Sequence, residues 1–117
     1  NNCIINIQGS GLESRSFCYV EDAVKGIILV SNKGKNNEVY NIGNQDEIKI
    51  KNLIYKIGKI LKVKVKIKSG KLQDGSALRR VPNIKKIKKL GYKSLNNLEI
   101  GLTKTVNWYK DYFLKND

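Results

Sequence analysis

Apolar and polar residues alternate along this chain with two periods, one typical of strands and one typical of helices. Between residues 63 and 68, Val and Ile alternate with Lys, which is the two-residue period of a half-buried strand. Short apolar runs of this kind predict strands at residues 3–8, 16–20, 38–43 and 63–70. Apolar residues three and four positions apart predict helices at residues 22–33, 50–61, 83–90 and 96–112.

The order of these segments, β-β-α-β-α-β-α-α, predicts a single α/β domain with a small mixed sheet of short strands. We expect Asp22 to cap the first helix, and Asn96 with Glu99 to form a capping box before the last one. Trp108 and Tyr109 are expected on the buried stripe of that last helix. The apolar positions of the first helix are Ala23, Val24, Ile27 and Ile28.

The formal net charge of +13 at first indicates nucleic-acid binding. The lysines, however, are scattered along the whole chain and alternate with Ile, Leu and Val. Arginine, which suits bidentate contacts to bases and phosphates, occurs only three times. We therefore expect no specific nucleic-acid binding, and we interpret the lysine excess as a compositional habit of the source genome.

The residues that bind metals are scarce. No histidine is present, and the two cysteines, Cys3 and Cys18, lie inside apolar stretches, so we expect reduced thiols, a cytoplasmic protein and no metal site. No apolar run approaches the roughly 18 residues of a membrane span, and no signal peptide is recognisable, so we expect no membrane association. Because the chain lacks Met and begins with Asn1, we expect an excised piece of a longer protein.

Local chemistry indicates no catalytic centre, because the chain has neither histidine nor a pair of neighbouring catalytic carboxylates. The glycine turns at residues 9–11 and 74–76 precede no helix of the kind that cradles phosphate, so both are interpreted as turns. Arginine stands only at Arg15 and at the pair Arg79-Arg80, in predicted loops. Arginine at only these positions of a lysine-rich chain favours a planar, bidentate contact such as one to a diphosphate. Structural ion pairs are the alternative. The residues near Arg15 that we expect in the core are Phe17, Cys18 and Val20.

Three stretches resemble, in order, the C-terminal part of the nucleotide-sugar epimerase/dehydratase family of extended short-chain dehydrogenases. They are GSGLESRSFCYVEDAVKGIILV, EVYNIGN and RRVPNIKKIKKLGYKSLNNLEIGLTKTVNWYKDY. Family members share Gly-x-Gly before Arg-Asp/Ser-Phe-x-Tyr-Val-x-Asp, then Asn-x-Gly, Arg-x-x-Asp-x-x-Lys and a final Gly-Leu-x-x-Thr-x-x-Trp-Tyr. The similarity runs from about residue 3 to residue 113, with Asn83 in place of the usual Asp and Ser94 in place of the usual Pro.

The resemblance implies that the whole enzyme binds NAD in an N-terminal Rossmann domain and a nucleoside-diphosphate sugar in its C-terminal part. It also implies transient oxidation of the sugar at C4, followed by epimerisation, dehydration or decarboxylation. The Gly-rich NAD fingerprint and the Tyr-x-x-x-Lys catalytic pair are absent from this sequence. We therefore expect residues 1–117 to be a substrate-binding portion without catalytic residues, inactive alone, from a homodimeric parent enzyme.

The resemblance also implies roles for individual residues. Arg15 matches the family arginine that reaches the substrate diphosphate or its nucleoside. Arg80, or Arg79 beside it, matches the second arginine of a phosphate clamp.

Three further residues are candidates through the same resemblance. Tyr19 matches an aromatic position near the nicotinamide, although it could equally belong to the core. Asn41 and Asn83 are candidate substrate contacts, although Asn41 can instead hold a turn. An Asn at position 83 can still cap a helix but lacks the charge of the usual Asp.

Two alternatives from other classes stay open. The chain could be a non-catalytic basic module that binds nucleic acid or another anion. It could also be a stand-alone product with only an interaction role.

Overall fold

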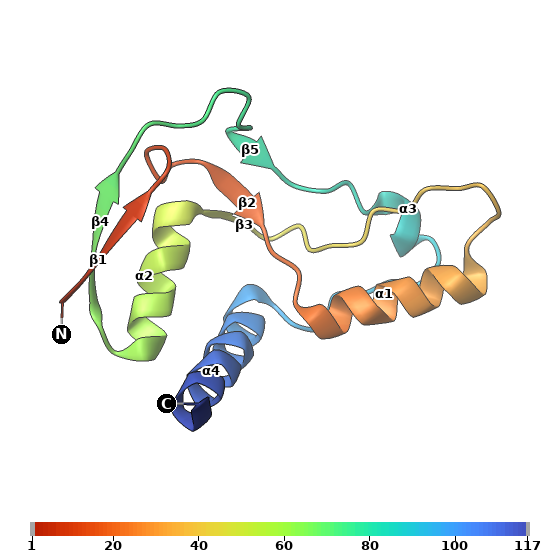
Figure 1. Cartoon of the computed structure of the whole chain (residues 1–117). Helices are drawn as coiled ribbons and strands as arrows, with labels where there is room; N and C mark the ends of the chain where they lie inside the picture. The colour runs from red at the N-terminus through yellow and green to blue at the C-terminus, as the bar shows by residue number, and fades with distance from the viewer. Residues whose placement is uncertain (1, 117) are drawn as a thin grey trace. The chain divides into compact units, whose positions relative to one another are not determined.

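The computed structural model describes residues 2–116 and divides the chain into two compact units. The first unit comprises Asn1–Arg15, Ile48–Arg80 and Leu102–Asp117, and the second comprises Ser16–Glu47 and Val81–Gly101. Figure 1 follows the elements along the chain, in the order β-β-α-β-α-β-β-α-α. The fold class is therefore mixed α/β, with one strand more than the sequence predicts.

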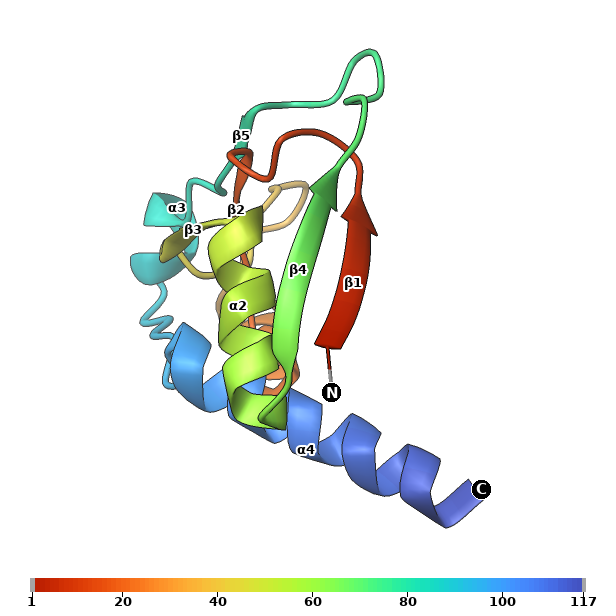
Figure 2. The same ribbon diagram turned by 90° about the vertical axis from the view of Figure 1, so that its left-hand side faces the viewer.

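Two parallel strands and a helix form the main layer of the first unit. Strand β1 (Asn2–Ile7) pairs with β4 (Lys64–Ser69), and Asn2 lies opposite Lys64. Figure 2 shows these strands side by side, with helix α2 (Ile50–Leu61) next to β4. Parallel strands need a crossover connection, and α2 lies between β1 and β4 in the chain. The predictions of these three elements are confirmed within two residues.

A close backbone approach holds α2 against β4. A Cβ atom at Gly58 of α2 would lie 2.6 Å from Val65 Cγ2, so only glycine fits here without a shift. The C-cap residue after the helix is Lys62, whose φ of 56° is in the left-handed region and whose N–H donates to the Gly58 carbonyl. The chain can therefore reverse at once into β4.

A second sheet has the strand order β3-β2-β5. Its strands are short: β2 spans Ser14–Ser16, β3 spans Glu47–Lys49 and β5 spans Arg79–Arg80. The sequence prediction placed the second strand at residues 16–20 and assigned a loop to β5, so both assignments are wrong. Two-residue strands of arginine carry no local strand signal, because only pairing with a neighbour defines them.

The strand predicted at residues 38–43 is absent, because the hydrogen bonds of this segment involve side chains and not a strand ladder. The Tyr92 hydroxyl donates to the Gly43 carbonyl at 3.1 Å. The Asn41 amide donates to the Asn83 carbonyl at 3.3 Å. Of the apolar residues that suggested a strand, Tyr40 and Ile42 pack against the core of the second unit, and Val39 is exposed.

The core of the second unit lies between helices α1 (Val20–Lys33) and α3 (Lys85–Lys88). Its buried members are Ile84, Ile87 and Tyr92, and the half-buried apolar residues around them are Leu29, Val30, Tyr40 and Ile42. Burial raises the pKa of the Tyr92 hydroxyl, and a contact with the Cys18 thiol adds to this.

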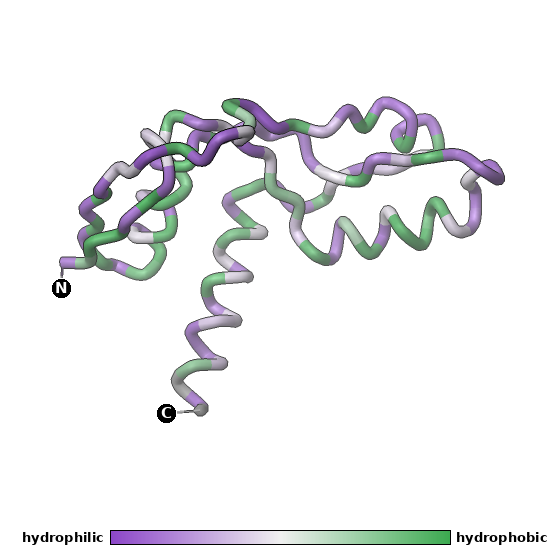
Figure 3. Tube along the Cα trace, turned by 45° about the horizontal axis from the view of Figure 1, so that its top comes forward, coloured by the Kyte–Doolittle hydropathy of each residue, from purple (hydrophilic) through white to green (hydrophobic). Residues whose placement is uncertain are grey.

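Helix α1 buries a different face from the one predicted. Asp22 and Gly26 are its fully buried residues, and a Cβ atom at Gly26 would lie 2.6 Å from Ile42 Cγ2. Apolar residues recur along the rest of this helix in Figure 3, and several of them face solvent. The exposed apolar side chains of α1 are Val20, Val24, Ile27 and Ile28, and Phe17 just before the helix is also partly exposed.

Helix α4 (Leu98–Asn116) begins with a different cap from the one predicted. The Asn97 side chain accepts the N–H of Ile100 at 2.9 Å, so Asn97 rather than Asn96 is the cap. Trp108 and Tyr109 were expected to be buried but are 59% and 53% exposed. Their rings stack along the helix with the neighbouring aromatic residues. No helix in the described part of the chain combines the length and apolar character needed to cross a membrane.

Candidate functional site

The two arginine positions singled out in the sequence meet on neighbouring strands of the first unit. Strands β2 and β5 run parallel, with Arg15 opposite Arg80 and Ser14 opposite Arg79. Register partners lie on the same face of the pleat, with strand axes about 4.8 Å apart. The topology thus places two cationic side chains, separated by 65 positions in the sequence, next to each other.

Neither Arg15 nor Arg80 has a carboxylate partner among the described residues. Arg15 is half-buried, and its Nη1 atom donates to the Ser14 carbonyl at 2.7 Å. Arg80 is exposed. Two like charges on adjacent strands repel each other unless an anion lies between them. The arrangement therefore suits an anionic ligand, and it does not support structural ion pairs at these two residues.

Glu13 organises the glycine turn before β2, a role that the sequence analysis missed. Its side chain accepts the Ser10 N–H and the Ser10 hydroxyl, each at 3.0 Å, and the Gly11 N–H at 2.8 Å. The N–H of Glu13 itself contributes most to lowering the pKa of this carboxyl, followed by the N–H of Ser10. The signal available in the sequence was an acid two residues after Gly11, in a turn of small residues.

This turn does not fit the phosphates of NAD. A phosphate-cradling loop offers free N–H groups and opens a helix, whereas the N–H groups of Ser10 and Gly11 are taken by the chain's own carboxylate. The turn leads into strand β2, and the turn at Gly75 leads towards β5. The interpretation of both glycine motifs as simple turns is confirmed.

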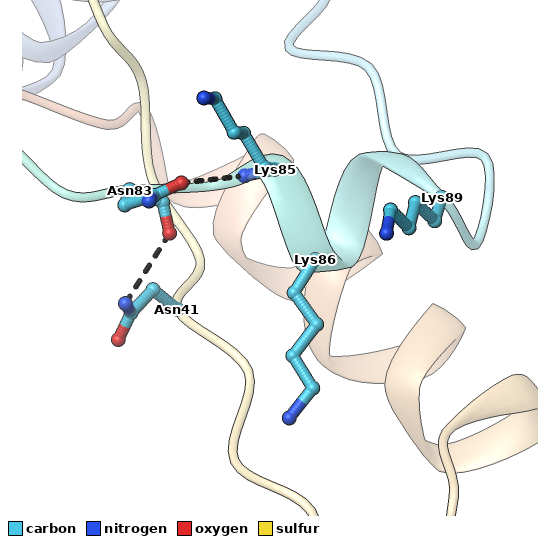
Figure 4. A pocket seen from close by; sticks show the side chains of 5 residues that line it. All are labelled: Asn41, Asn83, Lys85, Lys86 and Lys89. Carbon is cyan, nitrogen blue, oxygen red and sulfur yellow. Dashed lines mark hydrogen bonds between the residues drawn. The ribbon is translucent and has the colours of Figure 1, made fainter.

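In the second unit, the predicted residues Asn41 and Asn83 line one open pocket of about 330 Å³ (Figure 4). Its other lining residues are Lys85, Lys86 and Lys89. The Asn83 side-chain oxygen accepts the Lys85 N–H at 3.0 Å, so it is engaged at the start of α3. In Figure 4 the side chains of Lys85 and Lys86 point in opposite directions. The lysines therefore do not converge on a common ligand position.

Lys86 has a partner within its own unit, which the sequence analysis missed. Its ammonium group pairs with the Glu38 carboxylate and lies 4.8 Å from the centre of the Tyr40 ring. The hydrogen bond from Lys86, with its charge, lowers the pKa of Glu38. A pair separated by 48 residues leaves no local pattern, so the sequence offered no signal for it.

Tyr19 lies at the N-cap position of α1, and not in a strand as predicted. It is half-buried, and a Cβ atom at Gly101 would lie 3.0 Å from its own Cβ. The close approach to Gly101 favours a packing role, which the sequence analysis had left open beside a cofactor contact. Among the described residues, no group of three or more His, Cys, Asp or Glu is placed to hold a metal ion.

Comparison with known proteins adds family evidence to this geometry. Residues 4–43 match the NAD dependent epimerase/dehydratase family. An uncharacterized protein of Methanocaldococcus jannaschii is 36% identical over 115 residues, which is 95% of this chain and 35% of that protein. The dTDP-D-glucose 4,6-dehydratase of Mus musculus is 31% identical over 114 residues, which is 92% of this chain and 32% of that protein.

A solved structure gives the same indication. It is that of UDP-glucuronic acid 4-epimerase from Bacillus cereus in complex with UDP-glucuronic acid and NAD, which matches with a TM-score of 0.83 at 26% identity. The match covers 92% of this chain and 35% of that one. The chain thus spans about a third of the length of the relatives it matches. Sequence and structural similarity agree in relating this chain to part of the NAD-dependent epimerase/dehydratase family.

Proposed function

We propose that this chain is the substrate-binding part of an NAD-dependent enzyme that epimerises, dehydrates or decarboxylates a nucleoside-diphosphate sugar through transient oxidation at C4. Relatives named for a dTDP-sugar dehydratase and a UDP-sugar epimerase support this class of substrate. In the proposal, NAD is bound mainly by a Rossmann domain of the full-length protein, which is a homodimer.

The placement of Arg15 opposite Arg80 carries the proposal. One guanidinium on each strand can contact one phosphate group, and Arg79 is the alternative to Arg80. Each charge-assisted hydrogen bond of this kind contributes about 1.5–3 kcal/mol. The absence of a carboxylate partner at Arg15 and Arg80 within the described residues leaves both charges available for the ligand.

The remaining candidates have smaller proposed roles. Asn41 and Asn83 contact the substrate through amide groups, although their present hydrogen bonds tie chain segments together. Tyr19 lies near the nicotinamide. We expect substitutions at these three positions to change binding less than substitutions of the arginine pair.

The proposal is tested in the full-length protein with UDP- and dTDP-hexoses and NAD. Turnover of at least one nucleotide sugar is expected, and a complete lack of turnover with all of them would contradict the proposed activity. Arg15→Ala and Arg80→Ala should each weaken UDP-glucose or dTDP-glucose binding by about 1–3 kcal/mol, measured by calorimetry. Lys110→Ala, which removes another exposed cation of the same unit, is the control and should bind as the wild type does. Unchanged dissociation constants in both arginine variants would refute the clamp.

One observation favours a second candidate, a basic anion-binding module. Residues 49–71 contain nine lysines and no acid, and Lys64, Lys66 and Lys68 are exposed along β4. Alternate residues of a strand lie on one face, so these three charges form a row. Sub-micromolar DNA binding at physiological salt, with a steep salt dependence, would support this candidate, and millimolar binding would exclude it.

A further inference from the structure

Glu13 is a buried acid, 6% exposed, that stands two residues before Arg15 and yet does not pair with it. Its oxygens are occupied by the donors of Ser10 and Gly11. Hydrogen bonds to backbone N–H groups stabilise the charged form of a carboxyl. Because the Glu13 carboxylate is engaged by the turn, it forms no ion pair with Arg15, although it lies only two residues away in the sequence.

The backbone of the same turn ties together the segments that surround the arginines. The Glu13 carbonyl accepts the Ile50 N–H at 2.9 Å, and the Gly11 carbonyl accepts the Lys51 N–H at 3.0 Å. These two bonds attach the turn to the start of α2. The Gly9 carbonyl accepts the N–H of the residue after β4, Gly70, at 3.2 Å.

The link to β5 comes directly after Glu13. The Ser14 N–H donates to the Leu78 carbonyl at 2.9 Å, one residue before the pairing of Arg15 with Arg80. Strand β5 has only two residues, so its own ladder is too short to fix its register. The alignment of the two arginines must therefore depend on the turn that precedes β2.

The conformation of this turn needs the carboxylate. Gly9 and Gly11 have φ values of +87° and +79°, which are in the left-handed region. Flexible glycines lose much conformational entropy when they are held in one conformation. The Glu13 side chain lies so close that a Cβ atom at Gly9 would be 2.7 Å from its Oε1. The turn is thus folded around the acid.

We propose that Glu13 is a positioning residue, whose carboxylate holds the turn at residues 9–13 and so sets the alignment of Arg15 with Arg80 for an anionic ligand. The ligand part of this inference rests on the proposed function. The alignment itself rests only on the contacts within the first unit.

The test compares Glu13→Gln with Val65→Ala in the full-length protein. Glutamine keeps the size of the side chain but replaces one acceptor oxygen with a donor, which opposes the donors of Ser10 or Gly11. Val65 packs on α2 in the same unit and lies opposite Cys3 near the start of β4, whereas the turn bonds to Gly70 after the end of β4. Both variants are studied at temperatures where they are fully folded, by amide hydrogen exchange of residues 9–16 and by calorimetry with UDP-glucose.

We expect Glu13→Gln to accelerate exchange at Ser14 and to raise the UDP-glucose dissociation constant about tenfold. We expect Val65→Ala to change neither the exchange rate at Ser14 nor the dissociation constant, even if it lowers the melting temperature as much as Glu13→Gln does. The inference would be overturned if the Ser14 amide of Glu13→Gln exchanged at the same rate as in the wild type. It would also be overturned if Val65→Ala changed the exchange rate and the dissociation constant as Glu13→Gln does. If the wild type itself binds neither UDP-glucose nor dTDP-glucose, the proposed function fails. The exchange comparison alone then decides whether Glu13 orders the two strands.

Discussion

Among the described residues, each of the two units contains one buried acid, and the two acids differ in how far along the chain their hydrogen-bond partners lie. In the first unit, the Glu13 carboxylate accepts from Ser10 and Gly11, which are three and two positions away. Asp22 in the second unit is 0% exposed, and its carboxylate accepts from Ser94, Leu95 and Asn96, which are 72 to 74 positions away. One acid therefore shapes a turn, whereas the other joins distant parts of its unit.

The two units also differ in their apolar cores. Besides Asp22, the second unit contains a cluster of the buried residues Ile84, Ile87 and Tyr92. Among the described residues of the first unit, Ile48 and Val106 are the buried apolar side chains. The first unit thus depends more on hydrogen bonds for its geometry, and its arginine pair lies where local polar contacts fix the backbone. This contrast predicts that substitutions in the buried part of the second unit lower the stability of the fold, whereas substitutions in the turn of the first unit change mainly the local order of the backbone.

The largest effect is expected for Asp22→Ala. The substitution leaves the donors at residues 94–96 without their acceptor in a buried site, where each unpaired donor costs about 1–3 kcal/mol. We expect the free energy of unfolding to fall by about 3 kcal/mol in denaturant titrations. The control is Glu21→Ala, which removes the exposed neighbouring acid and should change stability by less than about 0.5 kcal/mol. Equal midpoints for the two variants would remove the contrast between the acids.

A smaller loss is expected for Gly26→Ala, which tests the buried face of α1. The new Cβ atom would lie 2.6 Å from Ile42 Cγ2 and 3.2 Å from the Tyr92 ring. Overpacking of about 1–3 kcal/mol should exceed the gain of about 1 kcal/mol in helix propensity, so we expect a net loss of about 1 kcal/mol. Val24→Ala, on the exposed face, should be neutral by the same thermal and denaturant measurements. A stabilised Gly26→Ala variant would contradict the packing described for this helix.

The pH dependence of stability separates the contribution of Asp22 from that of other acids. Burial alone raises the pKa of this carboxyl, but the hydrogen bonds from Asn96, Leu95 and Ser94 outweigh it and leave the pKa below the ordinary value of 3.8. A lowered pKa stabilises the fold above the ordinary value, and this stability is lost as the pH falls through the folded-state pKa. The difference in unfolding free energy between wild type and Asp22→Asn should therefore shrink below about pH 4. A difference that stays constant from pH 7 to pH 3 would show that the charge of Asp22 is not what stabilises the unit.

The sequence predicted those elements whose burial follows a local period. Val65 and Ile67 alternate with lysines and face inwards in β4 as expected. Helix α1 was predicted within two residues, but its buried face was predicted wrongly, because that face contains Asp22 and Gly26, residues that a hydrophobic pattern assigns to the surface. A buried acid is tolerated only because a remote segment supplies its donors, and no local rule reports such a partner.

The candidate site was likewise predicted only in part. Residue type alone singled out Arg15 and the pair Arg79-Arg80, since arginine is rare in a lysine-rich chain. Their pairing became visible only with the topology, because β5 has no strand signal of its own. Glu13 was missed because a short polar turn does not show which of its side chains will be buried.

The smallest effect is expected at the surface ion pair between Lys86 and Glu38. This pair provides an exposed charge of the second unit to compare with the buried Asp22. Both side chains are 44% exposed, so solvent and salt screen their attraction, although the Tyr40 ring adds a cation–π contact. Lys86→Gln should lower the melting temperature slightly at low salt and hardly at all at high salt. Lys88→Gln is the matched control, because Lys88 bonds only to the neutral Gln45 side chain and should show no salt-dependent difference. A large, salt-independent loss in Lys86→Gln would mean that the second unit depends on this pair as much as on Asp22, and the distinction between buried and exposed charges would then no longer hold.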